Sequence, residues 1–214
     1  MRPLLGQTVL AVEDSRYACE AIRLVCLRSG ARIRRADCLA AARRHLRAYR
    51  PTVVLVDRGL PDGSGMELIE ELAALDDPPV ILGISADDTE EAAARRAGAH
   101  GFLAKPMSSL AQFQAAVLAH LPAERQPLGP RPVIDDDVAP DTIAFHDDIA
   151  HAQQALEDGE RAYAAQFLAG VARCTGAEAL LGHARALAEA PENAELSQEL
   201  AAYLDALQET REPV

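Results

Sequence analysis

The sequence predicts an α/β domain built on a parallel β-sheet, followed by a smaller all-helical part. Three observations lead to this fold class. Short apolar, β-branched runs alternate with helical periods through the first 121 residues, the central runs are apolar throughout, and the composition from residue 141 onward is mostly Ala, Leu, Glu and Gln with helical spacing. Alternating strand and helix patterns are typical of a parallel sheet covered by helices on both faces. Strands that are apolar on both sides belong in the interior of such a sheet.

Five strand-like runs and five helical periods make up the α/β part. The runs fall at 8–12, 31–35 (the weakest), 52–56, 80–84 and 101–104. The helical periods that follow them fall at 15–29, 38–49, 65–75, 88–98 and 107–121. Gly30 and Gly98 stand just after the first and fourth helical periods, where a left-handed residue commonly ends a helix. We therefore expect helix C-termini at these two glycines.

A change of composition predicts three segments: a domain at 1–121, a linker at 122–140 and a helical domain at 141–214. The linker contains five prolines and the acidic run 135–137. Since proline fixes φ and removes a backbone donor, we expect a semi-extended spacer. The helical domain reads as four helices, at 142–157, 160–173, 176–190 and 193–209. Short loops between helices of this length favour an antiparallel bundle.

The charges are divided unevenly along the chain. Residues 1–121 carry 15 acidic and 15 basic side chains, while residues 122–214 carry 18 acidic and only 6 basic ones, so the second half holds the whole net charge of −12. Binding to nucleic acid depends on Lys and Arg that neutralise phosphates, and a recognition helix is basic. We therefore expect a helical output domain that does not bind DNA or RNA. No apolar run approaches the length of a membrane span, and we expect a cytoplasmic protein.

Polar side chains that suit one kind of chemistry follow four of the five predicted strands. Glu13 and Asp14 follow the first, Asp57 the third, Ser85 the fourth and Lys105 the fifth. Because the carboxyl ends of parallel strands share one edge of the sheet, these side chains are expected to converge there. Crowded carboxylates bind a hard cation such as Mg²⁺, and the cation and the ammonium would neutralise an incoming phosphoryl group. The pattern predicts phosphoryl transfer to a carboxylate.

Four separated motifs resemble the receiver domain of two-component response regulators. They are VLAVEDS at 9–15, VLVDRGLPDGSGMEL at 54–68, ISA at 84–86 and GFLAKP at 101–106, in the order and at the spacing of that family. The resemblance covers about residues 5–121. It implies a flavodoxin-like, doubly wound sheet of five parallel strands in the order 2-1-3-4-5, followed here by the helical bundle.

The resemblance also implies the role of each site residue. Asp57 would accept a phosphoryl group from a histidine of a sensor kinase or phosphotransfer protein. Glu13, Asp14 and Asp57, with the backbone carbonyl of Gly59, would hold Mg²⁺. The receiver would catalyse only its own phosphorylation and dephosphorylation, so the chain is not expected to be an enzyme of another kind.

Three further residues would respond to the phosphoryl group in such a receiver. Lys105 would pair with its oxygens, helped by a cis peptide bond between Lys105 and Pro106. Ser85 would move to meet the phosphate, and Phe102, at the family's aromatic switch position, would follow into the vacated space. Two alternatives stay open: Phe102 is a core residue, or the domain is a pseudo-receiver that acts as a scaffold without phosphorylation.

The helical domain more weakly resembles a histidine-phosphotransfer domain. QFLAGVARCTGAEAL at 166–180 places Gln166 where that family has its phospho-accepting histidine and Ala169 where it has a lysine, with Gly170 on the following glycine. The spacing of Gln166, Ala169 and Gly170 puts them on one helix face, which we expect to be a docking surface. An amide cannot carry a phosphoryl group, so the module would bind without transferring phosphate.

The helical domain also has other interpretations. It could be a generic helical bundle in which Phe167, Val171 and Cys174 are core, a tetratricopeptide-like hairpin, or an active phosphotransfer module fused to the receiver. Taken together, the sequence predicts a response regulator whose phosphorylation switches the contacts of its helical domain with an unidentified protein partner. A homodimer is left open.

Overall fold

The five predicted strands form one parallel sheet in the computed structural model, which describes residues 2–127 and 136–209. The strands are β1 (Thr8–Val12), β2 (Arg32–Ala36), β3 (Val53–Asp57), β6 (Val80–Ser85) and β7 (Gly101–Ala104). They are ordered β2-β1-β3-β6-β7, and every neighbouring pair is parallel. Because β6 and β7 are the fourth and fifth predicted strands, this order confirms the predicted flavodoxin-like sheet.

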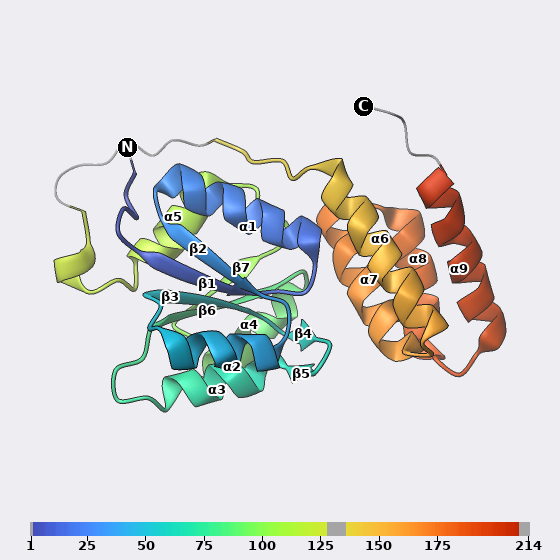
Figure 1. Cartoon of the computed structure of the whole chain (residues 1–214), viewed down its shortest axis with the longest axis horizontal. Coiled ribbons are helices and arrows are strands. Elements are labelled where there is room, and N and C mark those ends of the chain that lie inside the picture. The colour runs from blue at the N-terminus through green and yellow to red at the C-terminus, as the bar shows by residue number, and fades with distance from the viewer. Residues whose placement is uncertain (1, 128–135, 210–214) are drawn as a thin grey trace. The chain divides into compact units, whose positions relative to one another are not determined.

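Helices cover both faces of the sheet (Figure 1). One face carries α1 (Arg16–Ser29) and α5 (Leu110–Leu118), and the other carries α2 (Leu39–Ala48), α3 (Gly65–Ala73) and α4 (Glu91–Arg96). Along β3, Val53 and Leu55 belong to the core beneath α1 and α5, whereas Val54 and Val56 belong to the opposite core. Since successive side chains of a strand point to opposite faces, a strand buried on both sides must be apolar at every position.

The helix ends partly differ from the predicted ones. Gly30 and Gly98 follow α1 and α4 with φ of 86° and 107°, which confirms the left-handed ends. The period predicted at 88–98 divides into a short 3₁₀ helix, η1 (Asp88–Glu90), and α4. The last helix of this unit, α5, begins at Leu110 and not at 107, because the Ser109 hydroxyl accepts the backbone N–H of Gln112 at 3.2 Å and caps the helix.

Two strands in the α/β unit were not predicted. β4 (Gly59–Leu60) and β5 (Gly63–Ser64) form a two-residue antiparallel ladder directly after β3. Segments of two residues show no periodicity, so no sequence pattern announces them. This ladder precedes α3 and lies next to the C-terminal end of β3.

The segment predicted as a linker packs on the α/β unit at both of its described ends. It begins with a 3₁₀ helix, η2 (Ala123–Arg125). Further on, the backbone N–H of Val138 donates to the Ser108 carbonyl at 2.8 Å, and the Val138 side chain is buried in the core with α1 and α5. Residues 128–135, which include Pro130 and Pro132, lie outside the described part of the chain.

The second unit, which begins at Asp141, is a four-helix bundle (Figure 1). Its helices are α6 (Thr142–Glu157), α7 (Arg161–Thr175), α8 (Glu178–Glu189) and α9 (Ala194–Glu209). Each helix contacts the next, and α6 also contacts α9, so the four enclose a core that includes Ile149, Leu168, Leu180 and Leu204. Gly159 and Gly176 follow the C-terminal ends of α6 and α7 in the left-handed region, with φ of 83° and 72°. None of the helices described in either unit is long and apolar enough to cross a membrane.

Candidate functional site

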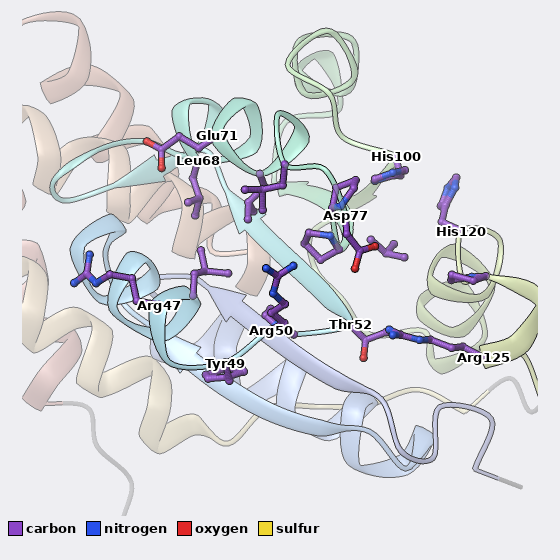
Figure 2. Close-up of a pocket in the computed structure, with 18 of the residues that line it drawn as sticks. Arg47, Tyr49, Arg50, Thr52, Leu68, Glu71, Asp77, His100, His120 and Arg125 are labelled. Atoms are coloured by element: carbon purple, nitrogen blue, oxygen red, sulfur yellow. The ribbon is translucent and has the colours of Figure 1, made fainter.

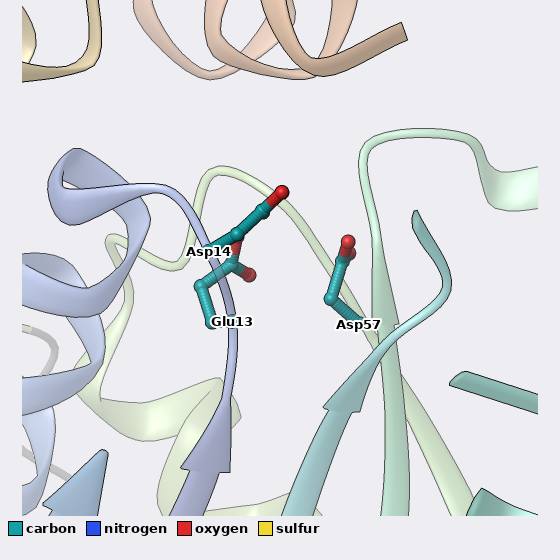
Figure 3. Close-up of side chains that lie close together, drawn as sticks. All are labelled: Glu13, Asp14 and Asp57. Atoms are coloured by element: carbon teal, nitrogen blue, oxygen red, sulfur yellow. The ribbon is translucent and has the colours of Figure 1, made fainter. Parts of the chain in front are cut away.

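The predicted site residues meet at one edge of the sheet. Glu13 and Asp14 follow β1, Asp57 is the last residue of β3, Ser85 is the last residue of β6, and Lys105 follows β7. β1, β3, β6 and β7 are consecutive and parallel, so their C-terminal ends deliver these side chains to the same place. Figure 3 shows the Glu13, Asp14 and Asp57 side chains gathered beyond the ends of the two strands that carry them.

Lys105 joins two of the carboxylates. Its Nζ lies 2.6 Å from Glu13 Oε2 and 2.7 Å from Asp57 Oδ1. The exposed fraction is 8% for the Lys105 side chain, 1% for Glu13 and 12% for Asp57. Removal from water raises the pKa of Glu13 well above its ordinary value, and the Lys105 ammonium lowers it only in part, while the Asp57 and Asp14 charges raise it further. The ammonium is thus held between two buried acids, one of which takes up a proton more readily than usual.

The three carboxylates form a group suited to a hard cation. One oxygen each from Glu13, Asp14 and Asp57 lies within 4.8 Å of the other two. Gly59 lies beside them, because its backbone N–H donates to Asp57 Oδ2 at 3.1 Å. Magnesium prefers carboxylate and carbonyl oxygens and keeps several waters, so the chemistry of this donor set fits Mg²⁺.

The two predicted switch residues lie on neighbouring strands, Ser85 at the end of β6 and Phe102 within β7. Ser85 is 9% exposed, and its hydroxyl accepts the backbone N–H of Asp87 at 3.1 Å. Phe102 on β7 is half-buried and packs with the core beneath α2, α3 and α4, against Gly83, where an added Cβ would come within 3.3 Å of its ring. The peptide bond between Lys105 and Pro106 is cis, as the resemblance implied.

One ion pair at the rim of the site was not predicted from the sequence. Arg58, which follows Asp57, places its Nε 2.7 Å from Oε1 of Glu90 at the end of η1. Desolvation raises the pKa of Glu90, and the Arg58 charge and a hydrogen bond from Ser85 oppose this rise. No motif links Arg58 and Glu90, since they belong to different βα units and each reads as an ordinary surface charge.

The candidate docking residues of the bundle differ in exposure. Gln166 is exposed, Ala169 is only 8% exposed, and Gly170 is half-buried with nothing within 4 Å of an added Cβ. Phe167 and Val171, on the same helix, are buried in the bundle core, as the interpretation of the domain as a generic bundle predicted, whereas Cys174, the third residue of that interpretation, is only half-buried. Of the three residues predicted to form a docking surface, Gln166 and Gly170 are therefore the more exposed ones.

Comparisons with known proteins agree with this geometry. Residues 9–117 match the family model of the response regulator receiver domain. The chain is 30% identical over 138 residues to the KDP operon transcriptional regulatory protein KdpE of Escherichia coli. This alignment covers 64% of this chain and 61% of the relative. It is also 30% identical over 155 residues to the transcriptional regulatory protein KdpE of Mycobacterium tuberculosis, in an alignment that covers 71% of this chain and 64% of the relative.

The matches thus span less than two thirds of the length of these curated relatives. Among solved structures, a two-component response regulator from Clostridium difficile is 20% identical with a TM-score of 0.49, covering 53% of this chain and 94% of that one. The family model alone covers half of the sequence, over the same strands whose ends carry the acidic group. The chain therefore belongs to the response regulator receiver domain family, and its α/β unit is the receiver domain of a two-component response regulator.

Proposed function

We propose that Asp57 is the phosphoacceptor of this receiver and takes a phosphoryl group from a histidine of a sensor kinase or phosphotransfer protein. The observation that carries this proposal is the Lys105 ammonium, which lies within 2.7 Å of Asp57 and within 2.6 Å of Glu13 at the C-terminal edge of the sheet. An ammonium held there is positioned to pair with oxygens of a phosphoryl group on Asp57. In the transfer, the P–N bond of phosphohistidine breaks as a P–O bond to Asp57 forms, and the imidazole leaves with the nitrogen electron pair.

The carboxylates of Glu13, Asp14 and Asp57, with the carbonyl of Gly59, would hold Mg²⁺. When bound, the ion supplies positive charge that offsets the charge developing on the phosphoryl oxygens. Lys105, which pairs with Glu13 and Asp57, offsets part of the negative charge that the carboxylates bring to this edge. The backbone N–H of Gly59, which donates to Asp57 Oδ2, fixes the orientation of the acceptor carboxylate.

Ser85 and Phe102 would convert the new charge into a change of surface. The Ser85 hydroxyl is bound to the Asp87 N–H. To donate a hydrogen bond to a phosphoryl oxygen, Ser85 would move toward Asp57 and vacate space that Phe102 is placed to enter from its position on Gly83. Phosphorylation acts in this way through local charge and packing on an element with two arrangements.

We propose that the helical bundle binds a protein and not DNA. Residues 122–214 carry 18 acidic and 6 basic side chains, a balance that opposes contact with phosphates. The curated relatives are named as transcriptional regulators, but a basic recognition helix has no counterpart in α6–α9. The docking surface would be centred on Gln166 and Gly170, with Ala169 at its margin, and Gln166 would make this module a binding partner that carries no phosphate.

A direct test uses beryllofluoride with Mg²⁺, which occupies a phosphoacceptor carboxylate as a stand-in for the phosphoryl group. Amide resonances of Ser85–Glu90 and Phe102 in the ¹⁵N-labelled full chain are expected to shift in the wild type and to stay in place in Asp57→Asn. Asp76→Asn, at an exposed acid in the loop after α3, is the matched control and should respond like the wild type.

Two results would contradict the proposal. An absent response in the wild type, or an equal response in Asp57→Asn, would remove Asp57 as the acceptor. If the protein responds but a captured partner binds wild type and Asp57→Asn equally tightly in the presence of a phosphodonor, the bundle is a constitutive scaffold and not a switched output.

A further inference from the structure

A large cavity lies at the edge of the receiver sheet opposite Asp57. It is lined by the end of α2, by α3, by the residues just before β3, β6 and β7, and by η2, and its volume is about 890 Å³ (Figure 2). Small-molecule sites in proteins commonly have volumes of about 300–1,000 Å³. The cavity shares no residue with the acidic group at the C-terminal edge, so it is a separate candidate site.

One wall of the cavity is apolar. Leu68 and Leu72 of α3 are buried beneath it, and Leu75 stands at its margin with 49% of its surface exposed. Leu75 is one of only four large apolar side chains that are markedly exposed among the described residues. An apolar wall beside an exposed leucine favours a ligand with an apolar body.

The cavity also presents guanidinium groups that have no partner within the described part of the chain. Arg43 is already engaged, since it makes two hydrogen bonds to Glu71, at 2.6 and 3.1 Å. The other lining arginines, Arg47, Arg50 and Arg125, form no ion pair or side-chain hydrogen bond with any described residue. In Figure 2 the Arg50 guanidinium points in among the lining residues, and Arg125 extends toward Thr52.

Two carboxylates, from Asp77 and Glu124, line the same cavity, and neither forms an ion pair with a described residue. Apart from the Arg43–Glu71 pair, the lining therefore holds three guanidinium groups and two carboxylates, an excess of positive charge. Tyr49 also lines the cavity, and its hydroxyl oxygen is buried without a hydrogen-bond partner among the described residues. Guanidinium groups bind carboxylate and phosphate in a planar, bidentate manner, and a free hydroxyl adds a donor.

We propose that this cavity binds a small amphipathic anion, in which an apolar body packs on Leu72 and Leu75 and a carboxylate or phosphate group pairs with Arg50 and Arg125. The receiver would then carry a ligand site at the edge of its sheet opposite the phosphoacceptor. The site is independent of the proposed chemistry at Asp57, because none of the residues that form it belongs to the acidic group.

The test titrates the ¹⁵N-labelled full chain with probes that share one eight-carbon chain and differ in the head group. Nonanoate and monooctyl phosphate, which both carry an octyl chain, should give saturable amide shifts at residues 46–52, 75–80 and 122–125, and their relative affinities decide between a carboxylate and a phosphate ligand. Octyltrimethylammonium, with the same chain and a positive charge, should bind at least about tenfold more weakly, the factor that one charge-assisted hydrogen bond provides.

Matched substitutions locate both halves of the ligand. Arg50→Met should weaken binding of the anions about tenfold, while Arg96→Met, at an exposed arginine outside the cavity, should leave it unchanged. Leu75→Asn should weaken binding, whereas Leu27→Asn, at a leucine of equal 49% exposure on α1, should not.

Three outcomes would overturn the proposal: no saturable shifts with either anion, equal binding of octyltrimethylammonium, or equal losses in Arg50→Met and Arg96→Met. Asp57→Asn separates this inference from the proposed phosphotransfer. It should bind the octyl anions as the wild type does, even though it no longer responds to beryllofluoride.

Discussion

Lys105→Met tests whether one ammonium holds the acidic edge of the sheet together. In the wild type its Nζ lies 2.6 and 2.7 Å from two buried carboxylates. At an effective dielectric constant of about 20, each contact corresponds to about 6 kcal/mol of Coulomb attraction, much of which is offset by taking the charges out of water. Removing one member of a buried ion pair lowers stability by about 3–5 kcal/mol in practice. We expect Lys105→Met to lower the free energy of unfolding of the receiver by about 3 kcal/mol at pH 7.5 without Mg²⁺.

The loss should shrink as the pH falls. Burial already raises the pKa of Glu13, and Lys105, which opposes that rise, is absent in the variant. The folded variant therefore binds this proton more readily than the unfolded chain does, so its stability falls as pH rises and recovers as Glu13 is protonated. The difference between variant and wild type should be smaller at pH 5 than at pH 7.5.

Hydrogen exchange of the buried β3 amides, followed by mass spectrometry, measures this free energy within the receiver alone. Far-UV circular dichroism would also report the bundle, and the chain has no tryptophan for fluorescence. Arg96→Met, which removes an exposed cation, should change β3 exchange by less than about 0.5 kcal/mol. Equal protection in Lys105→Met and wild type, or a loss that does not depend on pH, would refute the electrostatic account of this edge.

Three further predictions concern capping, the bundle core and a histidine. The Asp62 carboxylate accepts two backbone N–H groups at the start of α2, at 2.7 and 2.9 Å. Desolvation raises the pKa of Asp62, but these hydrogen bonds bring it below the usual value. Asp62→Ala should therefore lower the free energy of unfolding in urea by about 1 kcal/mol above about pH 4, and by less as the pH falls below that. Leu168→Ala truncates a side chain that is 0% exposed and should lower the opening free energy of α7 amides by about 3 kcal/mol in hydrogen exchange. Desolvation and the neighbouring His100 and Arg95 lower the pKa of His120, so its ring resonances should titrate with a midpoint below 6.5, and a midpoint at or above 6.5 would contradict this environment.

The sequence predicted the receiver sheet because its signals are local. The apolar runs at 52–56 and 80–84 mark strands that are buried on both faces, and the separated motifs fixed their order through the family resemblance. The four bundle helices were placed within a few residues for the same reason, since breaks at Gly159 and Gly176 punctuate a helical period. The convergence of Glu13, Asp57 and Lys105 follows from strand order alone.

What the sequence missed depends on contacts between distant segments. Arg58 and Glu90 form an ion pair at the site, and Asp62 caps a helix that begins more than 20 residues before it. Val138, within the predicted spacer, is buried in the receiver core. No local sequence pattern marks the contacts of these residues. Hydrophobic periodicity indicates which side of its own helix or strand a residue lies on, but not which side chain of another element it contacts.

The sequence by itself determined that this chain has a parallel α/β receiver with three carboxylates and one ammonium at a sheet edge, followed by an acidic helical bundle. Only the tertiary structure decided that the Lys105 ammonium bridges Glu13 and Asp57, and that arginines from α2 and η2 share a cavity with an apolar wall of α3 at the opposite edge. The reason is physical, because strand order decides which strand ends lie side by side. The distances between charges, and the space left between helices, depend instead on how the side chains of different elements pack together.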